Sequence, residues 1–218
     1  MITLYSAPSP NGYKVSCMLE ELGLPYTVKC IDVYNQEQKR EWFLKISPNN
    51  TIPALSVDGF TIFDSAAIMQ YLAERYDRLI PKDRFARVEM LKWFAFQSTT
   101  ISPVFGRLAL LNRYHRKGNR AEIARLKVEC NRLLDIINDQ LEERTYLAFE
   151  YSISDIAAWS WIRIYEWLGL DIAKYKHVAA WVDLIGARPA IQRGIEKPAV
   201  KETLIAHVCG AQRLLAQG

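Results

Sequence analysis

The first 80 residues alternate between short apolar strands and amphipathic helices, and this order restricts the folds open to the chain. The predicted elements are, in order, a strand Ile2–Ser6, a helix Gly12–Leu22, a strand Tyr26–Val33, a short helix or irregular segment Gln36–Ile46, two strands Ala54–Val57 and Thr61–Phe63, and a helix Ser65–Tyr76. Asp58-Gly59 lies between the last two strands and is typical of a tight hairpin. The order strand–helix–strand, then strand–strand–helix, predicts an α/β domain.

Beyond Tyr76, a polar connector precedes a region in which every predicted element is a helix. These helices are Phe85–Tyr114, bent at Pro103 and Gly106, then Ile123–Leu141, Ile153–Leu168, Val178–Gly186 and Pro189–Ile195. The segment Ile153–Leu168 is apolar nearly all round, which indicates a central buried helix. We therefore predict a thioredoxin-like α/β domain over residues 1–78, a linker over 79–84 and an all-α domain over 85–218.

The composition is that of an ordinary globular protein. Half of the 218 residues are hydrophobic, and no run approaches about 18 apolar residues, so a membrane span is not expected. The N-terminus has no basic region followed by an apolar run, and we expect no signal peptide. The net charge is +4, and residues 81–218 have an excess of six basic residues, much of it between Arg107 and Arg132. This stretch is either a solvated helix face or a field that attracts a small anion. Without a stacking platform or binding motif, nucleic acid is not an expected partner.

The cysteines and histidines do not form metal or redox motifs. The four cysteines are far apart and form no Cys-x-x-Cys pair: Cys17, Cys30, Cys130 and Cys209. We interpret them as reduced thiols, Cys17 as inert packing, and the setting as cytoplasmic. The three histidines have no ligand spacing, and we expect no metal site: His115, His177 and His207.

The segment Ser9-Pro10-Asn11-Gly12 follows the first strand and opens the first helix. In a thioredoxin-like domain, this junction is the place of a Cys-x-x-Cys pair. Here it contains a hydroxyl and a carboxamide but no thiol, so it cannot carry out disulfide chemistry alone, although it can bind and activate the thiol of another molecule. The alternative is structural: Ser9 and Pro10 also form a good N-cap and first-turn pair, and Asn11 is common in turns.

Two further segments converge on this junction in such a fold. Pro53 precedes a strand, where a cis Ile52–Pro53 bond would expose the backbone N–H and C=O of Ile52 to a peptide-like ligand. Asp64 and Ser65 lie at the start of a helix, where we expect Ser65 to be the cap and the free N–H groups to attract an anion, while Asp64 accepts from an ammonium group. A ligand with an α-amino acid group at one end and a thiol in the middle fits all three segments.

The chain resembles the glutathione transferases. Three segments are similar to the nu-class branch, which includes bacterial disulfide-bond reductases and is similar to the yeast nitrogen-regulation prion protein: Ala7–Lys14, Ile46–Leu55 and Phe63–Leu72. The resemblance covers nearly the whole chain. It implies glutathione as co-substrate, reduced or oxidised, with a small disulfide or an electrophile as second substrate, and a homodimer.

The resemblance also implies roles by position. Ser9 and Asn11 would lie at the glutathione sulfur as the catalytic residues. The residues implied to bind glutathione are Gln38 and Ile52 for the glycyl and cysteinyl parts, with Pro53 beside them, Asp64 and Ser65 for the γ-glutamyl end, and Arg132, which in some members reaches glutathione across a dimer interface. Two features depart from the branch: Thr51 stands where a Lys is common, and Arg107–Leu111 is more apolar than is usual there.

These roles predict a glutathione-dependent enzyme. Asn11 and Ser9 can donate hydrogen bonds to a thiolate beside the positive end of the first helix, which lowers the thiol pKa. The thiolate can then attack a disulfide sulfur or an electrophilic carbon, and the residues alone leave both reactions open. The expected apolar wall for the second substrate consists of Phe94, Ile101, Val104, Phe105 and Tyr114. The remaining alternative is a non-catalytic binding or regulatory module.

Two other features have structural interpretations. Ser152 and Asp155 match a Ser-x-x-Asp capping box at the start of the Trp-rich helix. Tyr5 invites comparison with the catalytic tyrosine of other transferase classes, but it lies within the first strand, so we expect it in the core.

Overall fold

The computed structural model describes residues 1–114 and 118–199. His115, His207 and Cys209, and the end of the predicted helical domain, therefore lie outside the described residues. The N-terminal domain is made of β1 (Ile2–Ser6), α1 (Pro10–Leu22), β2 (Thr27–Cys30), the 3₁₀ turn η1 (Glu37–Lys39), α2 (Glu41–Leu44), β3 (Ala54–Val57), β4 (Phe60–Phe63) and α3 (Ser65–Tyr76). This is the thioredoxin-like arrangement that the element order predicted.

Within the described residues, the strands form a mixed four-stranded sheet in the order β2-β1-β3-β4. β1 runs parallel to β2 and antiparallel to β3, and β3 runs antiparallel to β4. The register places Tyr5 opposite Ala54, and Ala54 opposite Phe63. The segments that follow β1, precede β3 and follow β4 therefore leave the sheet at one edge, which is where the three predicted ligand segments lie.

The second domain is entirely helical in the part that the structure describes. Its elements are α4 (Arg84–Phe96), the π-helical turn η2 (Gln97–Ile101), α5 (Ser102–Tyr114), α6 (Arg120–Leu141), α7 (Ile153–Ile162), the 3₁₀ turn η3 (Glu166–Leu168), α8 (Lys176–Gly186) and α9 (Pro189–Ile195). The central helix α7 is buried along its whole length, as its composition predicted. Its capping box is confirmed: the Ser152 N–H donates to Asp155 Oδ2 at 3.1 Å.

Two predicted elements end earlier in the structure. The helix predicted over Ile153–Leu168 ends at Ile162 and is followed by the turn η3. The second strand ends at Cys30 rather than Val33, because the Asp32 carboxylate accepts the N–H groups of Tyr34 and Asn35 and turns the chain. The long predicted helix contains the π turn η2 just before Pro103, and α5 runs through Pro103 and Gly106. Proline disturbs the turn before it, since its ring meets the carbonyl four residues back, here in η2.

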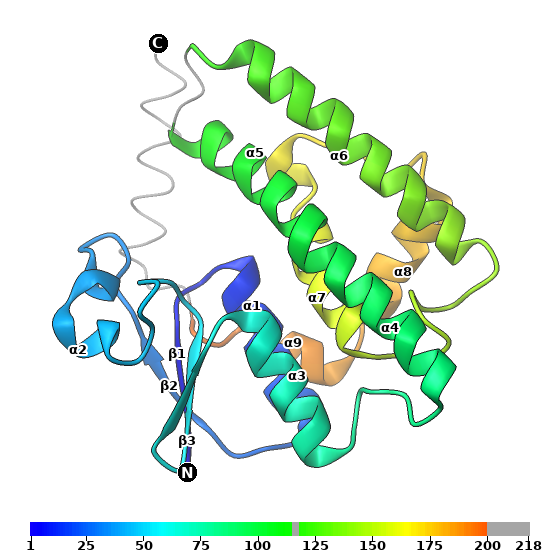
Figure 1. Ribbon diagram of the computed structural model, residues 1–218. Helices are drawn as coiled ribbons and strands as arrows, with labels where there is room; N and C mark the ends of the chain where they lie inside the picture. The colour runs from blue at the N-terminus through cyan, green and yellow to red at the C-terminus, as the bar shows by residue number, and fades with distance from the viewer. Residues whose placement is uncertain (115–117, 200–218) are drawn as a thin grey trace.

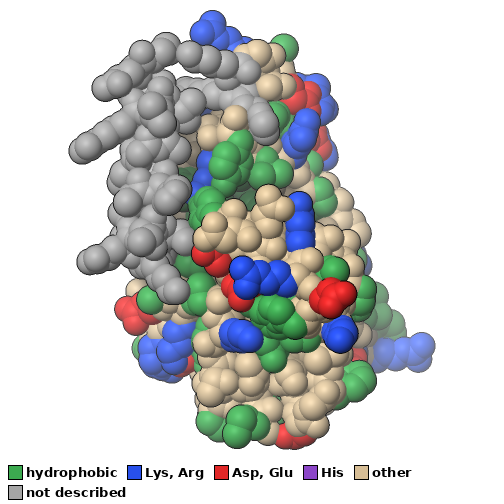
Figure 2. Space-filling model, turned by 90° about the vertical axis from the view of Figure 1, so that its left-hand side faces the viewer, with side chains coloured by type: hydrophobic (Ala, Val, Ile, Leu, Met, Phe, Trp, Pro, Cys, Tyr) green, Lys and Arg blue, Asp and Glu red, His purple; other side chains and the backbone are tan. Residues whose placement is uncertain are grey.

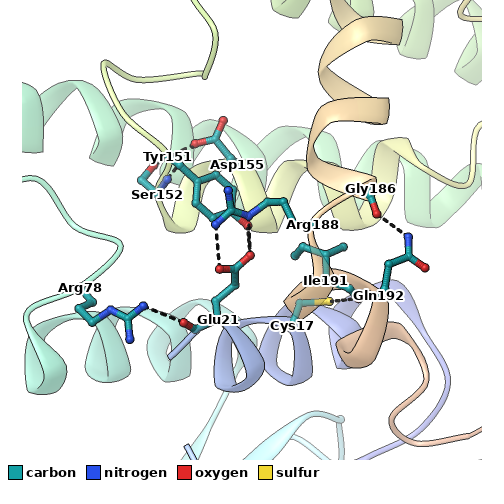
Figure 3. A network of polar contacts seen from close by, with 10 residues as sticks. All are labelled: Cys17, Glu21, Arg78, Tyr151, Ser152, Asp155, Gly186, Arg188, Ile191 and Gln192. Atoms are coloured by element: carbon teal, nitrogen blue, oxygen red, sulfur yellow. Dashed lines mark hydrogen bonds and ion pairs between the residues drawn. The ribbon is translucent and has the colours of Figure 1, made fainter. Parts of the chain in front are cut away.

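The two domains share one hydrophobic core. Figure 1 shows α1 between the sheet and the helices α7 and α9. Ser16 Oγ donates to the Gly194 carbonyl at 2.7 Å, and Cys17 Sγ donates to the Ile191 carbonyl at 3.7 Å. Farther along α1, Glu21 forms an ion pair with Arg188 (Figure 3). Because three side chains of α1 contact α9 or its cap, the orientation of α1 against the helical domain is closely fixed.

The surface has a mixed character. On the face in Figure 2, Lys and Arg side chains are interspersed with acidic, polar and apolar ones rather than gathered into one basic band. Of the helices in the described parts of the chain, none combines the length and the apolar character needed to cross a membrane.

Candidate active site

Ser9 is the N-cap of α1. Its backbone is extended (φ −161°, ψ 156°), Pro10 follows at the first helical position, and Ser9 Oγ accepts the Gly12 N–H at 3.1 Å. A Cβ on Gly12 would lie 2.4 Å from Ser6 Oγ, so this tight junction requires glycine. The structure confirms the capping interpretation of Ser9. The cap uses only an acceptor site of the hydroxyl. Among the described residues the O–H hydrogen has no acceptor, so it can donate to a ligand.

Asn11 lies where the two domains meet. Its Oδ1 accepts the indole N–H of Trp161, from α7, at 3.0 Å, and the hydroxyl of Ser102, from α5, at 3.4 Å. Among the described residues, the two Nδ2 hydrogens have no acceptor. An indole N–H can only donate, so the contact with Trp161 assigns the oxygen of the carboxamide to the helical domain. The amide nitrogen is the part of Asn11 left for another molecule.

The Ile52–Pro53 bond is cis, as predicted. The preceding turn is held by Ser47, whose hydroxyl donates to the Thr51 carbonyl at 2.9 Å. The backbone N–H and C=O of Ile52 make no hydrogen bond to any other described residue. Since Ala54 pairs with Tyr5, the free peptide groups of Ile52 lie beside the end of β1 that leads to Ser9.

Asp64, not Ser65, is the N-cap of α3, which corrects the expectation from the sequence. Asp64 has positive φ (72°), and its Oδ1 accepts the N–H groups of Ala66 at 2.8 Å and Ala67 at 3.4 Å. The chain turns at Asp64 and is already helical at Ser65, so only the carboxylate of Asp64 reaches back to the first-turn N–H groups. Ser65 is buried at the first helical position. In the described part of the chain, neither its hydroxyl nor Asp64 Oδ2 has a hydrogen-bond partner.

Lys14 ends the segment Ala7–Lys14, but the sequence did not predict a role for it in the site. It follows Asn11 by one helical turn, and its side chain is only 3 % exposed. Burial lowers its pKa to about 7, while the negative charge of Asp64 opposes that shift. Asn11 and Lys14 are three residues apart, which places both on one face of α1. This spacing is the sequence feature that indicates Lys14 as a site residue. The candidate site thus contains a buried amine, partly protonated near neutral pH, that feels the charge of the carboxylate capping α3.

Gln38 lies in η1, on the loop that follows β2. Cys30, the last residue of β2, pairs with Ser6, so this loop leaves the sheet at the same edge as the other segments. The loop is tied to the helical domain by a hydrogen bond between the Arg113 guanidinium and the Tyr34 hydroxyl. Gln38 Oε1 is buried and has no hydrogen-bond partner among the described residues. A buried acceptor without a partner is uncommon, and a bound donor is one explanation for it.

Arg132 is not brought to this edge within one chain. It lies on α6 and pairs with Glu129 of the same helix, Nε to Oε2 at 2.9 Å. In Figure 1, α6 lies on the far side of the helical domain from the sheet. A contact of Arg132 with a ligand would therefore need a second copy of the chain, and this role stays a prediction.

Three of the five residues predicted for the apolar wall are core residues instead. Phe94, Ile101 and Phe105 are at most 5 % exposed. Ile101 and Phe105 are one turn apart and face the same way, into the core, which sequence periodicity cannot distinguish from a pocket wall. Val104 is half-buried and Tyr114 is exposed.

Tyr5 and Cys17 have the structural roles predicted for them. Tyr5 is half-buried, with its ring against Trp42 and Phe43 at centroid distances of 6.3 and 6.4 Å. Burial raises the pKa of the Cys17 thiol to about 12, a value at which it is not a nucleophile. In residues 1–114 and 118–199, no group of three His, Cys, Asp or Glu side chains is placed to bind a metal ion.

Family models match both domains. Residues 8–75 match the N-terminal domain of glutathione S-transferases, and residues 94–189 match the C-terminal domain. The chain belongs to the glutathione transferase family. Within it, the chain is 36% identical to the disulfide-bond oxidoreductase YfcG of Escherichia coli, over 90% of this chain and 95% of that protein. The similarity to the disulfide-bond oxidoreductase branch is thereby confirmed.

Solved structures of other transferases have the same architecture. A glutathione transferase from Pseudomonas putida, with one glutathione disulfide bound per subunit, is 34% identical, with a TM-score of 0.84 over 91% of this chain and 92% of that one. A transferase from Burkholderia graminis, with two glutathione molecules bound per subunit, is 36% identical, with a TM-score of 0.82 over 92% of this chain and 89% of that one.

Two residues of this site carry no signal in the sequence: Trp161 and Ser102. Both contact Asn11 but lie 150 and 91 residues farther along the chain. Trp161 lies in the apolar segment Ile153–Leu168, where the sequence predicts burial, and no neighbouring residue indicates where its indole N–H donates. The structure shows that Asn11 depends on the helical domain for its orientation.

Proposed function

We propose that this transferase binds glutathione along the shared sheet edge and uses its thiolate to reduce small disulfides. The observation that supports this most is the carboxamide of Asn11. Its oxygen is occupied by Trp161 and Ser102, so toward the junction it presents only N–H donors. A sulfur that accepts hydrogen bonds is favoured as thiolate over thiol. Ser9 adds one O–H donor, and the N-terminus of α1 adds a positive partial charge.

The proposed glutathione contacts follow from the groups left free. The peptide N–H and C=O of Ile52, before cis Pro53, pair with the backbone of the cysteinyl part. Asp64 and Ser65 bind the ammonium and carboxylate of the γ-glutamyl end. Gln38 Oε1 accepts the N–H of the glycyl part, which gives this buried oxygen its missing partner. These are the roles that the family resemblance implies, assigned to atoms that have no other partner within residues 1–114 and 118–199.

The proposed reaction uses two glutathione molecules because the junction has no thiol of its own. The first thiolate attacks one sulfur of the disulfide, forms a mixed disulfide and releases the other sulfur as a thiolate, which takes up a proton. The second glutathione thiolate attacks the mixed disulfide, yields glutathione disulfide and releases the second product thiol. Each disulfide reduced consumes two glutathione molecules. The two bound glutathione molecules of the B. graminis relative support this stoichiometry.

We also propose a homodimer in the cytoplasm. The large apolar side chains exposed on β4 and α4 support a dimer, among them Phe60, Phe63, Phe85 and Val88. Among the described residues, Cys17 and Cys130 are buried free thiols, which supports a reducing compartment. The role of Arg132 across the dimer belongs to this proposal.

The test is a parallel measurement of turnover with reduced glutathione against hydroxyethyl disulfide and against chlorodinitrobenzene, a model electrophile. Disulfide reduction with weak conjugation is the expected result. Strong conjugation with no disulfide reduction would make this a conventional transferase. If calorimetry detects no glutathione binding, the site proposal is overturned. Glutathione binding without either activity would favour the non-catalytic module.

A further inference from the structure

Two tryptophans of α7 direct their indole N–H groups to different domains. Trp159 is 3 % exposed, and its indole N–H donates to the Val182 carbonyl at 2.9 Å, a bond within the helical domain. Trp161 is 8 % exposed, and its indole N–H leaves that domain to reach Asn11 Oδ1 at 3.0 Å. One tryptophan therefore stabilises the packing of its own domain, and the other contacts the side chain proposed to face the glutathione sulfur.

The ring of Trp161 rests on the backbone of α5. A Cβ on Gly106 would lie 3.3 Å from its Cη2 atom and 3.7 Å from Cζ2, so the indole occupies the space that a side chain at this position would take. The 3.3 Å contact is tighter than usual, so a side chain here would displace the ring by a few tenths of an ångström. Gly106 thereby lets the indole lie close to α5 and within reach of Asn11.

Ser102 reaches the same oxygen from a different element. It is the first residue of α5, directly after the π turn η2, and its Oγ lies 3.4 Å from Asn11 Oδ1. A π turn adds a residue to the helix and changes the face on which the following residues lie, and such turns are frequent at functional sites. Two donors from two helices thus converge on one carbonyl oxygen, which has two lone pairs.

We propose that Trp161 is a positioning residue that, together with Ser102 and Gly106, holds Asn11 as a pure hydrogen-bond donor toward the glutathione sulfur. The inference rests on the proposed function, since it concerns the orientation of Asn11 in the same site. An amide facing sulfur with its oxygen would accept from the S–H and favour the thiol. The same amide facing it with nitrogen favours the thiolate. Trp161 therefore decides the sign of the effect that Asn11 has on the thiol pKa.

Removing the indole N–H frees the carboxamide to rotate, because its terminal torsion has broad preferences. We expect the pKa of bound glutathione to rise by about one unit in Trp161→Phe, because the amide then no longer presents only N–H donors to the charged sulfur. Turnover near neutral pH should fall about tenfold and recover at high pH. The KM for glutathione should change little, because its two ends are bound by other residues.

The matched control is Trp159→Phe. It makes the same substitution two residues away on the same helix and removes a comparable indole hydrogen bond. Trp159 also lies beside a glycine, Gly186, where an added Cβ would be 3.6 Å from Trp159 Cζ2. The ultraviolet absorbance of the thiolate gives the pKa of bound glutathione by titration, and the pH profile of turnover gives it independently. Trp159→Phe should keep the wild-type pKa even if it lowers the unfolding midpoint.

Two additional variants keep the proposal testable if Trp161→Phe folds poorly. Ser102→Ala removes the second donor and should raise the thiol pKa by a smaller amount. In an Asn11→Ala background, Trp161→Phe should cause no further shift, because the group that it positions is absent.

The outcomes separate the two proposals. A wild-type protein that binds glutathione without lowering the thiol pKa overturns the thiolate mechanism and this inference with it. The second outcome is that the wild type lowers the pKa of bound glutathione and that both Trp161→Phe and Ser102→Ala lower it to the same extent. That outcome overturns only the positioning role. A raised pKa in Trp161→Phe, absent in Trp159→Phe and lost in the Asn11→Ala background, supports it.

Discussion

Arg188, the residue before α9, holds Glu21 of α1 in a two-point ion pair across the domain boundary (Figure 3). Its Nε lies 2.6 Å from Oε1 and its Nη2 lies 2.9 Å from Oε2. The Tyr151 hydroxyl donates to the same carboxylate at 3.1 Å, and the guanidinium lies 3.8 Å above the Tyr151 ring. Bidentate geometry and a carboxylate that is 7 % exposed distinguish this pair from ordinary surface ion pairs.

Arg188→Ala should lower the free energy of unfolding by about 2–3 kcal/mol, because it leaves the nearly buried Glu21 without its cation. Urea unfolding measures this. The matched control is Arg193→Ala on the same α9, which removes a more exposed partner of Glu20 while Lys197 remains bound to that carboxylate. We expect the control to cost under about 1 kcal/mol. Equal losses of unfolding free energy in the two variants would show that the buried ion pair stabilises the fold no more than the exposed one.

The fold was predictable where the signals are local. The Asp58-Gly59 hairpin, the Ser152–Asp155 capping box and the helix Ser65–Tyr76 each depend on residues within one or two turns of one another, and the structure has all three. Alternation with period two or near 3.6 gives the element type without tertiary information. The element order then restricts the topology.

The site was predictable only in part, because its chemistry depends on contacts between distant segments. The sequence located Asn11 but not Trp161, which fixes the orientation of the Asn11 amide. It assigned the cap of α3 to Ser65, since nothing in the sequence indicates that the chain has positive φ at Asp64. It offered Ile101 and Phe105 as a substrate wall, although an apolar face looks the same against a core or a pocket.

Asp155 gives the stability of the fold a testable pH dependence. Its buried carboxylate accepts hydrogen bonds from the Leu147 N–H at 2.9 Å, the Ser152 N–H at 3.1 Å and the Trp181 indole at 3.1 Å. Burial raises the pKa of Asp155 from 3.8 to about 6, although these donors oppose the shift. A raised pKa means that the folded state holds the proton more tightly than the unfolded chain does. The contribution of Asp155 to stability is therefore greatest below about pH 4 and declines as the pH rises to about 6.

Asp155→Asn is the non-titrating reference for this effect. The unfolding free energy of the wild type minus that of the variant should fall by up to about 3 kcal/mol between about pH 4 and pH 6, since one pKa unit equals about 1.4 kcal/mol. Urea unfolding at several pH values measures the difference. A difference that grows with pH would show that the hydrogen bonds outweigh burial and that the pKa is lowered instead.

The two roles of Ser9 can be separated by substitution. Ser9→Ala removes the cap of α1 and should cost about 1 kcal/mol of stability, whereas Ser9→Gly keeps a tolerated cap residue and should cost about 0.3 kcal/mol. Both variants lack the hydroxyl. If the O–H donates to the glutathione thiolate, both should lose turnover near neutral pH by the same factor despite their different stability. Turnover that follows stability instead would reduce Ser9 to a cap.

Asn11 and Ser65 should affect different kinetic constants. Asn11→Ala removes a donor to the charged sulfur, so kcat at neutral pH should fall about tenfold or more, with little change in the KM for glutathione. Asn11→Asp places a negative charge there and should lower kcat more than Asn11→Ala does, because a like charge raises the thiol pKa.

Ser65→Ala removes a contact to the γ-glutamyl end, away from the reacting atoms, so KM should rise more than kcat falls. Steady-state kinetics with varied glutathione measures both constants. An Asn11→Ala enzyme with full turnover would contradict the thiolate mechanism, and unchanged glutathione affinity in Ser65→Ala would contradict the γ-glutamyl site.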